Sequence, residues 1–259
     1  MKKMAYQPKM KIIVVIPARF QSSRFPGKPL ADIHGKPMIQ HVYHRSCQAT
    51  CTHRVIVATD DQRIADVVNG FGGEVMMTSP DHPSGTDRVV EVSRRVAADI
   101  YINVQGDEPL IRPGDIDLLA QSMLDDPQCK VATLCHPMPI EEALDANKVK
   151  LIVSHTGNVL YFSRGLIPYS SHTAYQPEYL KHIGIYGFRS EVLAEYNKLP
   201  LSRLENQERL EQLRLLESDI PIRAVRTSQT GPGVDTPACL ERVKQLMARE
   251  YSQDIELAN

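Results

Sequence analysis

The sequence has no tryptophan, few aromatic residues and no excess of either charge. Aromatic side chains make up 6% of its 259 residues, and the formal net charge is −1 at pH 7. Surfaces that bind nucleic acids combine clustered positive charge with aromatic rings on which bases stack, and the overall composition offers neither. We therefore expect no nucleic-acid partner, and any site for an anion must be built locally.

Long apolar runs and paired cysteines are also missing. No segment approaches the roughly 20 apolar residues of a membrane span, and the run 12–16 is too short for the core of a signal peptide. The five cysteines form no C-x-x-C pair, which argues against a disulfide framework and a structural zinc site. These absences predict a cytoplasmic protein with reduced thiols and no membrane association. Residues 1–9 are expected to form a loose leader.

Short apolar runs alternate with amphipathic segments through the first half of the chain. This succession of strand, loop and helix predicts an α/β fold, in which a mainly parallel sheet is covered by helices on both faces. At this length we expect a single domain, 1–259. The predicted strands lie at residues 12–16, 55–58, 75–78 and 101–104, and the predicted helices at residues 37–49, 64–68, 86–97 and 113–124.

The pattern changes after about residue 131, where strand candidates follow one another with shorter connections. We predict an inserted lobe at about residues 149–190 on the same core, and a loop at residues 170–178. The spacing of leucines then predicts one helix over residues 202–216. A last helix is expected over residues 235–247, with Thr236 as its N-cap and Pro237 at its first position.

The loop after the first predicted strand is rich in positive charge. It carries Arg19, Arg24 and Lys28 together with two serines and a Pro-Gly pair. Open α/β sheets bind ligands at the carboxyl ends of their strands, and cations with free backbone N–H groups suit a polyphosphate there. The spacing is neither that of a Walker loop nor that of a dinucleotide fingerprint. An ordinary solvated loop is the alternative that composition alone leaves open.

Two isolated aspartates lie at later turns. Asp107 follows the predicted strand 101–104, and Asp235 precedes the last predicted helix. Mg²⁺ prefers one or two carboxylates combined with phosphate oxygens and water. An acidic turn or a helix cap would explain either aspartate alone. Together with the cationic loop, the two predict a site for Mg²⁺ and a triphosphate.

Two other segments carry polar groups suited to binding. The hydroxyls and amides of residues 84–86 open a predicted helix and can hold a nucleobase edge or an anion, and Arg88 can pair with a substrate carboxylate. Strand alternation places His182, Gly184 and Tyr186 on one face. The simpler alternatives are that Ser84 or Thr86 caps the helix and that the histidine is structural.

Together these segments resemble the motifs of the 3-deoxy-manno-octulosonate cytidylyltransferases, the CMP-Kdo synthetase family. The resemblance runs roughly from residue 11 to residue 247, and it is specific because the order and mutual distances of the motifs agree. The motifs are Pro17-Ala18-Arg19 with the rest of the loop to Leu30, then residues 57–60, 84–88, 103–109, 160–164, 181–186, 210–214 and 233–237.

The resemblance implies a Rossmann-like three-layer nucleotidyltransferase fold, with an inserted lobe that carries the interface of a homodimer. It also implies Mg²⁺-dependent transfer of CMP from CTP to 3-deoxy-D-manno-octulosonate (Kdo), with release of pyrophosphate, for lipopolysaccharide synthesis. The implied catalytic residues are Lys28, Asp107 and Asp235, and the two aspartates are the implied metal ligands. The implied CTP contacts are Arg19, Arg24, Lys28, Ser84, Gly85 and Thr86, and the implied sugar-acid contacts are Arg88, Gln105, His182, Tyr186, Glu211 and Gln212.

One segment departs from the family. After Ile167-Pro168-Tyr169 the family usually has an arginine with an acidic neighbour, whereas this chain has Ser170-Ser171-His172-Thr173. The acceptor therefore stays open between Kdo, its 8-amino analogue (8-amino-3,8-dideoxy-manno-octulosonate) and a sialic-type acid, with a sugar 1-phosphate as a more distant choice. A regulatory protein that binds nucleotide without catalysis is the alternative from another class. The presence of both aspartates and all three cations argues against it.

Overall fold

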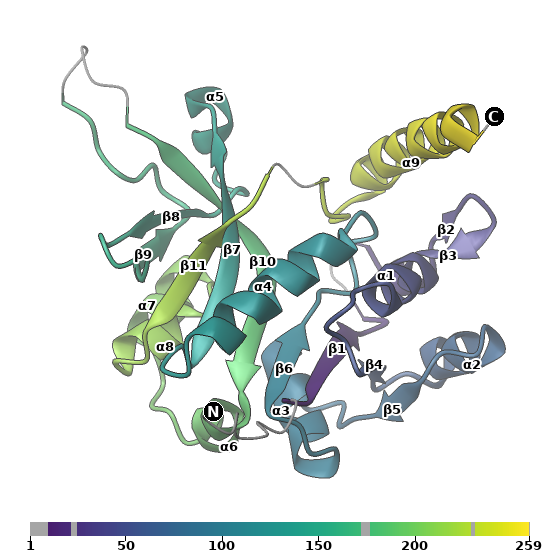
Figure 1. Cartoon of the computed structure of the whole chain (residues 1–259), viewed down its shortest axis with the longest axis horizontal. Helices are drawn as coiled ribbons and strands as arrows, with labels where there is room; N and C mark the ends of the chain where they lie inside the picture. Colours follow the sequence, from purple (N-terminus) through teal and green to yellow (C-terminus); the bar gives the residue numbers. More distant parts are fainter. Residues whose placement is uncertain (1–9, 22–24, 172–176, 229–230, 259) are drawn as a thin grey trace, which may run out of the picture.

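The computed structural model describes residues 10–21, 25–171, 177–228 and 231–258, with side chains described as far as residue 250. Within these ranges the chain builds a nine-stranded sheet with helices packed on its two faces (Figure 1). The expected leader, 1–9, lies outside the described residues. No helix in the described part is both long enough and apolar enough to cross a bilayer.

The elements follow one another in the expected alternation. The strands of the large sheet are β1 (Ile12–Ala18), β4 (Arg54–Thr59), β5 (Val75–Met77), β6 (Ile100–Asn103), β7 (Val131–Met138), β8 (Lys150–Val153), β9 (Val159–Ser163), β10 (Tyr179–Arg189) and β11 (Ile222–Arg226), and a small ribbon consists of β2 (Asp32–Ile33) and β3 (Lys36–Pro37). The helices are α1 (Met38–Cys47), α2 (Gln62–Gly70), α3 (Gly85–Arg95), α4 (Pro113–Asp125), α5 (Ile140–Ala143), α6 (Ser190–Tyr196), α7 (Arg203–Glu208), α8 (Leu213–Glu217) and α9 (Pro237–Ala258), with a 3₁₀ turn η1 (Lys28–Leu30).

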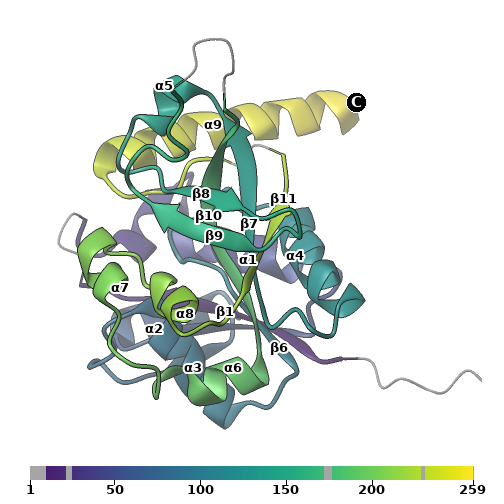
Figure 2. The same ribbon diagram turned by 90° about the vertical axis from the view of Figure 1, so that its left-hand side faces the viewer.

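The first strand lies inside the sheet, between two parallel neighbours. The order is β11-β7-β10-β6-β1-β4-β5, and β1 pairs in parallel with both β4 and β6. The long strand β10 runs antiparallel to β6 and β7, and it also pairs with β8, which carries β9 beside it (Figure 2). The mainly parallel α/β fold expected from the sequence is therefore confirmed.

Side chains of β1 pack against helices on both sides of the sheet. All seven residues of the strand are buried. Ile12, Val14 and Ile16 join a cluster with apolar residues of α1, α2 and α4, whereas Ile13 and Val15 join one with residues of α3 and α6. Alternate side chains of a strand point to opposite faces, so one continuous apolar run contributes to both halves of the core.

The helix expected over residues 202–216 is wrong as a single element. The chain forms α7 and α8 with a break at Arg209, whose φ of 54° is left-handed and ends α7. The leucine spacing suggested continuity, but the turn between the helices lets Leu210 and Leu213 both reach the core. Residues 211 and 212 consequently lie in this turn and at the start of α8. Of the expected loop 170–178, residues 172–176 lie outside the described part.

The last helix, α9, begins beside Asp235. The Thr236 hydroxyl accepts a hydrogen bond from the Cys239 amide at 3.3 Å, and Pro237 is the first helical residue, so the predicted N-cap is confirmed. Apolar side chains of α9 pack on the β2–β3 ribbon and the start of α1. This packing holds the position of Asp235 against the main body of the protein.

Replacing Ile13 with alanine tests the central place of β1. The side chain is 0% exposed, so its loss leaves a cavity and is expected to lower the free energy of unfolding by about 2–5 kcal/mol. Leu201→Ala, at a side chain that is 89% exposed, is the control and is expected to change it by less than about 0.5 kcal/mol. Urea denaturation measures both, and equal losses would contradict the burial pattern.

Candidate active site

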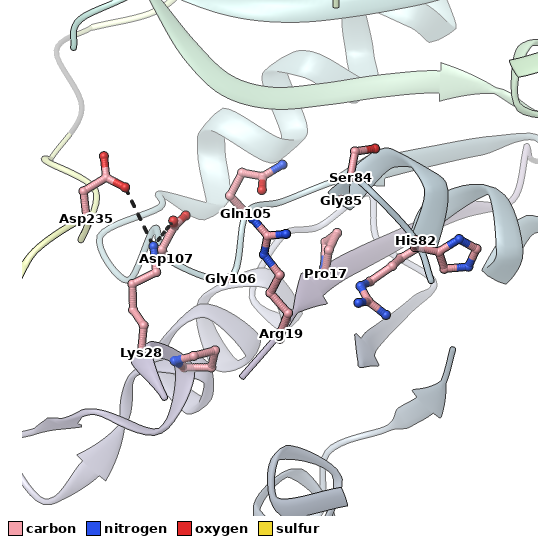
Figure 3. Close-up of a pocket in the computed structure, with 13 residues that line it drawn as sticks. Pro17, Arg19, Lys28, His82, Ser84, Gly85, Gln105, Gly106, Asp107 and Asp235 are labelled. Atoms are coloured by element: carbon pink, nitrogen blue, oxygen red, sulfur yellow. Dashed lines mark hydrogen bonds and ion pairs between the residues drawn. The ribbon is translucent and has the colours of Figure 1, made fainter. Parts of the chain in front are cut away.

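A cavity of about 220 Å³ lies at the carboxyl ends of β1 and β6 (Figure 3). Its walls come from the loop after β1, the start of α3, the turn after β6 and the segment before α9. Parallel strands bring these turns, which are distant in the sequence, to one edge of the sheet. The predicted site residues that line it are Arg19, Lys28, Ser84, Gly85, Arg88, Gln105, Asp107 and Asp235.

A lysine lies between the two predicted metal ligands. Lys28 Nζ is 2.5 Å from Asp107 Oδ2 and 3.8 Å from Asp235 Oδ1 (Figure 3). Arg19 is exposed at the mouth of the cavity. The third predicted cation, Arg24, lies outside the described residues. The described groups thus bring an ammonium, a guanidinium and two carboxylates to one cavity.

Backbone contacts hold the two aspartate turns together. The Val234 amide donates a hydrogen bond to the carbonyl oxygen of Asp107 at 2.8 Å, which ties the segment that carries Asp235 to the turn after β6. A Cβ on Gly106 would lie 2.8 Å from the Pro17 carbonyl oxygen, so this close approach of two strand ends requires glycine. The spacing of the aspartates is therefore built into the main chain.

Arg88 is a buried cation that also lines the cavity. Its Nη1 donates hydrogen bonds to the Thr78 hydroxyl at 2.7 Å and to the Ser79 carbonyl oxygen at 3.0 Å. Its Nη2 lies 3.2 Å from Asp60 Oδ2. The guanidinium is 3% exposed, and its position is held by these three partners.

The start of α3 combines a helix cap with a cavity wall. Ser84 Oγ accepts a hydrogen bond from the Asp87 amide at 3.2 Å and donates one to Asp87 Oδ2 at 2.7 Å, so the capping alternative for Ser84 is correct. Ser84 and Gly85 line the large cavity, whereas Thr86 is buried beside a second, much smaller one. The same turn thus contacts both spaces.

The second cavity, of about 10 Å³, is surrounded by buried polar atoms without partners. Tyr186, Glu211 and Gln212 line it with Thr86. Within the described residues, Tyr186 Oη, Glu211 Oε2 and Gln212 Nε2 are buried and make no hydrogen bond. Buried polar groups are normally paired, so such a cluster indicates a missing water or ligand.

Strand β10 also approaches the larger cavity, at Gln105. The place of a Cβ on Gly184 lies 3.6 Å from Gln105 Cγ, so β10 passes over this residue of the larger cavity. The rings of His182 and Tyr186 are 5.3 Å apart, which agrees with the predicted alternation along the strand. Gln105 Nε2 donates to Asn103 Oδ1 at 3.2 Å, which orients the amide.

Burial favours the uncharged forms of the groups near the second cavity. It raises the pKa of Glu211, while the hydroxyls of Ser84 and Thr86 oppose this shift. It raises the pKa of Tyr186 well above its ordinary value and, with help from a nearby lysine, lowers the pKa of His182 to about 3. The charged groups therefore gather at the first cavity, and the second is lined mainly by neutral hydrogen-bonding groups.

Sequence reasoning missed two residues of the site. Burial and then the neighbouring charge of Asp107 raise the pKa of Glu108 to about 8, and a Cβ on Gly233 would lie 2.7 Å from its Oε1. His82 lines the large cavity and donates from Nε2 to Glu91 Oε2 at 2.5 Å. Glu108 could have been noticed from its place beside Asp107, whereas the sequence carries no signal for the pairing of His82.

Comparison with known proteins agrees with this geometry. A family model described as cytidylyltransferase matches residues 13–222. The 3-deoxy-manno-octulosonate cytidylyltransferase of Escherichia coli is 55% identical over 244 residues, which cover 94% of this chain and 99% of that protein. The enzyme of the same name from Syntrophobacter fumaroxidans is 47% identical over 246 residues, which cover 93% of this chain and 98% of that protein.

Solved structures give the same result. A CMP:2-keto-3-deoxy-manno-octonic acid synthetase complexed with CTP matches with a TM-score of 0.90 and 56% identity, covering 93% of this chain and 99% of that chain. A cytidylyltransferase from Leptospira borgpetersenii, 16% identical with a TM-score of 0.65, covers 93% of this chain and 87% of its own and shares the Rossmann-like fold. The chain therefore belongs to the cytidylyltransferase family and, within it, to the 3-deoxy-manno-octulosonate cytidylyltransferases, which are nucleotidyltransferase enzymes.

Proposed function

We propose that this chain transfers CMP from CTP to Kdo, forming CMP-Kdo and pyrophosphate for lipopolysaccharide synthesis. The observation that carries the proposal is the meeting of Lys28, Asp107 and Asp235 in one cavity, beside a second group of unpaired buried polar atoms. The oxygen of the anomeric 2-hydroxyl forms a bond to the α-phosphorus. The bond from that phosphorus to the oxygen bridging to the β-phosphorus breaks, and the hydroxyl proton is released. Such a transfer depends on positioning and charge neutralisation more than on covalent catalysis.

The positive groups at the first cavity are the proposed contacts of the triphosphate. Lys28 and Arg19 are placed to neutralise phosphate oxygens and the departing pyrophosphate, and Arg24 is proposed to join them. The amides and hydroxyls of Ser84, Gly85 and Thr86 at the start of α3 suit a nucleobase edge or an anion. A nucleotide that spans this cavity would contact both walls.

Asp107 and Asp235 are the proposed ligands of Mg²⁺. Carboxylate oxygens are the ligands that this ion prefers. In the described part of the chain no group of three or more His, Cys, Asp or Glu side chains is placed to hold a metal, so the two aspartates would need other ligands beside them. Phosphate oxygens of CTP and water would complete the coordination. The ion supplies charge neutralisation and lowers the pKa of a nearby hydroxyl, so no side-chain base is required. Lys28 is then expected to turn from the carboxylates to the phosphates.

The sugar acid is proposed to bind between Gln105 and the second cavity. Tyr186, Glu211 and Gln212 offer unpaired hydrogen-bonding atoms there, which suits a molecule rich in hydroxyl groups. Arg88 is the proposed partner of its carboxylate. An arginine has five N–H donors, and its contacts with Thr78, Ser79 and Asp60 leave others available.

The 8-amino analogue of Kdo and a sialic-type acid are the alternative acceptors. The segment that departs from the family begins at Ser170, next to Tyr169, whose side chain is 87% exposed. We propose that a change in this segment alters the choice of acceptor without changing the phosphate chemistry of Lys28, Asp107 and Asp235. The alternative functions therefore differ in the acceptor molecule, whereas the transfer of CMP from CTP is the same in each.

We also propose that the chain works as a homodimer in the cytoplasm. Leu160, Leu166 and Tyr169 expose 59%, 36% and 87% of their surface on the segment that includes β9, and burying such side chains favours association. The five cysteines are free thiols, which suits a reducing compartment.

Pyrophosphate release from CTP tests the function. With Kdo and Mg²⁺ the native protein is expected to release pyrophosphate, and Asp107→Asn is expected to reduce kcat by about 100-fold or more because a metal ligand is lost. Asp66→Asn, on the exposed face of α2, is the control that should leave the rate unchanged. Release at the native rate by Asp107→Asn would refute the metal role, and faster release with the 8-amino analogue would favour that acceptor.

Glu211→Gln tests the sugar site. The variant is expected to raise the KM for Kdo about tenfold while leaving the KM for CTP within about twofold, because Glu211 Oε2 is an unpaired buried atom that lines the second cavity. Glu195→Gln, on the exposed side of α6, serves as the control. Equal changes in the two KM values would contradict the proposed role of Glu211 in binding the sugar.

Charge on two of these exposed apolar side chains tests the dimer. The double variant Leu160→Asp/Tyr169→Asp is expected to sediment as a monomer at micromolar concentration, and the native chain is expected to sediment as a dimer. Leu201→Asp, whose parent side chain is 89% exposed outside this segment, is the control that should remain dimeric. A dimer that survives the double substitution would have to use another face.

A further inference from the structure

A buried threonine of β7, Thr133, contacts β10 at a β-bulge. The pairing of the two strands moves from Ile183 opposite Leu134 to Tyr186 opposite Thr133, so residues 184 and 185 have no partner across the ladder. Thr133 is 0% exposed, and its Oγ1 lies 2.8 Å from the Ile185 carbonyl oxygen and 3.2 Å from that of Ile183. The hydroxyl thus reaches two carbonyl groups at the bulge, and one of them, that of Ile185, belongs to a residue without a partner across the ladder.

The same hydroxyl oxygen lies 3.1 Å from His182 Nε2. A threonine has one hydroxyl hydrogen, and a carbonyl oxygen can only accept, so we assign this hydrogen to the nearest acceptor, the Ile185 carbonyl oxygen at 2.8 Å. Thr133 Oγ1 can then only accept from the imidazole. His182 consequently carries its hydrogen on Nε2 and leaves a lone pair on Nδ1, which makes no hydrogen bond to any residue that the structure describes.

The imidazole is held in this form by its surroundings. Its centroid is 5.0 Å from that of Phe162 and 5.3 Å from that of Tyr186, so the half-buried ring packs against two aromatic side chains. Burial and the charge of Lys181 lower its pKa to about 3, which keeps the ring neutral near pH 7. A neutral ring with so low a pKa is a poor base for a sugar hydroxyl and offers no charge to a carboxylate. It can accept a hydrogen bond.

This acceptor lies on the side of β10 that faces the active site. His182, Gly184 and Tyr186 share that side, and Gly184 passes over Gln105 of the larger cavity. Ile183 and Ile185 belong to the core on the opposite face of the sheet. The imidazole therefore lies beside Tyr186, which lines the second cavity.

We propose that Thr133 is a positioning residue that fixes the Nε2–H tautomer of His182, so that Nδ1 accepts a hydrogen bond from a hydroxyl group of the acceptor sugar. The sugar contact rests on the function proposed above, whereas the tautomer does not. Thr133 itself touches no substrate. It acts through the imidazole and through the backbone of the bulge.

The experiment compares Thr133→Val, which keeps the shape and removes the hydroxyl, with Thr133→Ser, which keeps the hydroxyl. The ¹⁵N shifts of His182, assigned by difference from His182→Gln, report the tautomer in the protein without sugar. The native chain and Thr133→Ser are expected to show Nε2–H, and Thr133→Val a mixture of tautomers. Thr133→Val is also expected to raise the KM for Kdo about tenfold, with kcat and the KM for CTP within about twofold, and serine is expected to restore it.

Several results would overturn the proposal. Finding the hydrogen on Nδ1 in the native chain would overturn it without any variant. The test therefore remains decisive even if Thr133→Val fails to fold. An unchanged KM for Kdo in a folded Thr133→Val with a mixed tautomer would also overturn the proposal. Failure of the native chain to use Kdo would refute the function instead, and the ¹⁵N shifts would still decide the tautomer.

Discussion

The ion pair of Lys28 with two aspartates is the interaction on which the large cavity depends. Asp107 and Asp235 approach one ammonium group, and like charges so close in a partly buried space repel one another strongly. Glu108 adds a third carboxyl, whose pKa is raised first by burial and then by the neighbouring charge of Asp107. A cation at the position of Lys28 Nζ offsets this repulsion, and the hydrogen bond from the Val234 amide to the Asp107 carbonyl oxygen joins the two segments.

Much of the architecture could be predicted because it follows from local rules. The buried run of β1 and the amphipathic helices that surround it imply a parallel sheet, and parallel strands end at one edge. That geometry explains how Lys28, Asp107 and Asp235 could be grouped from the sequence before any distance was known. Alternation along β10 likewise placed His182 and Tyr186 on one side. In each case the prediction rests on the regular repeat of side-chain directions along a strand or a helix.

The features that could not be predicted are non-local or involve unusual backbone angles. The left-handed conformation of Arg209 divides the expected helix, and a non-glycine residue gives no sign of it in the sequence. The contact of Thr133 with the bulge depends on the register between β7 and β10. The raised pKa of Glu108 depends on burial and on the charges of Asp107 and Asp235, and Asp235 lies on another turn. None of these has a short-range pattern.

The hydrogen bond between Val234 and Asp107 has a consequence for the time at which the enzyme becomes competent. The large sheet receives its last described strand, β11, at Arg226, and Asp235 follows it in the chain. A ribosome therefore releases the strands of the scaffold before it releases the second carboxylate and the helix that anchors it. A nascent chain can therefore complete the strands of its sheet while still lacking half of its proposed magnesium ligands.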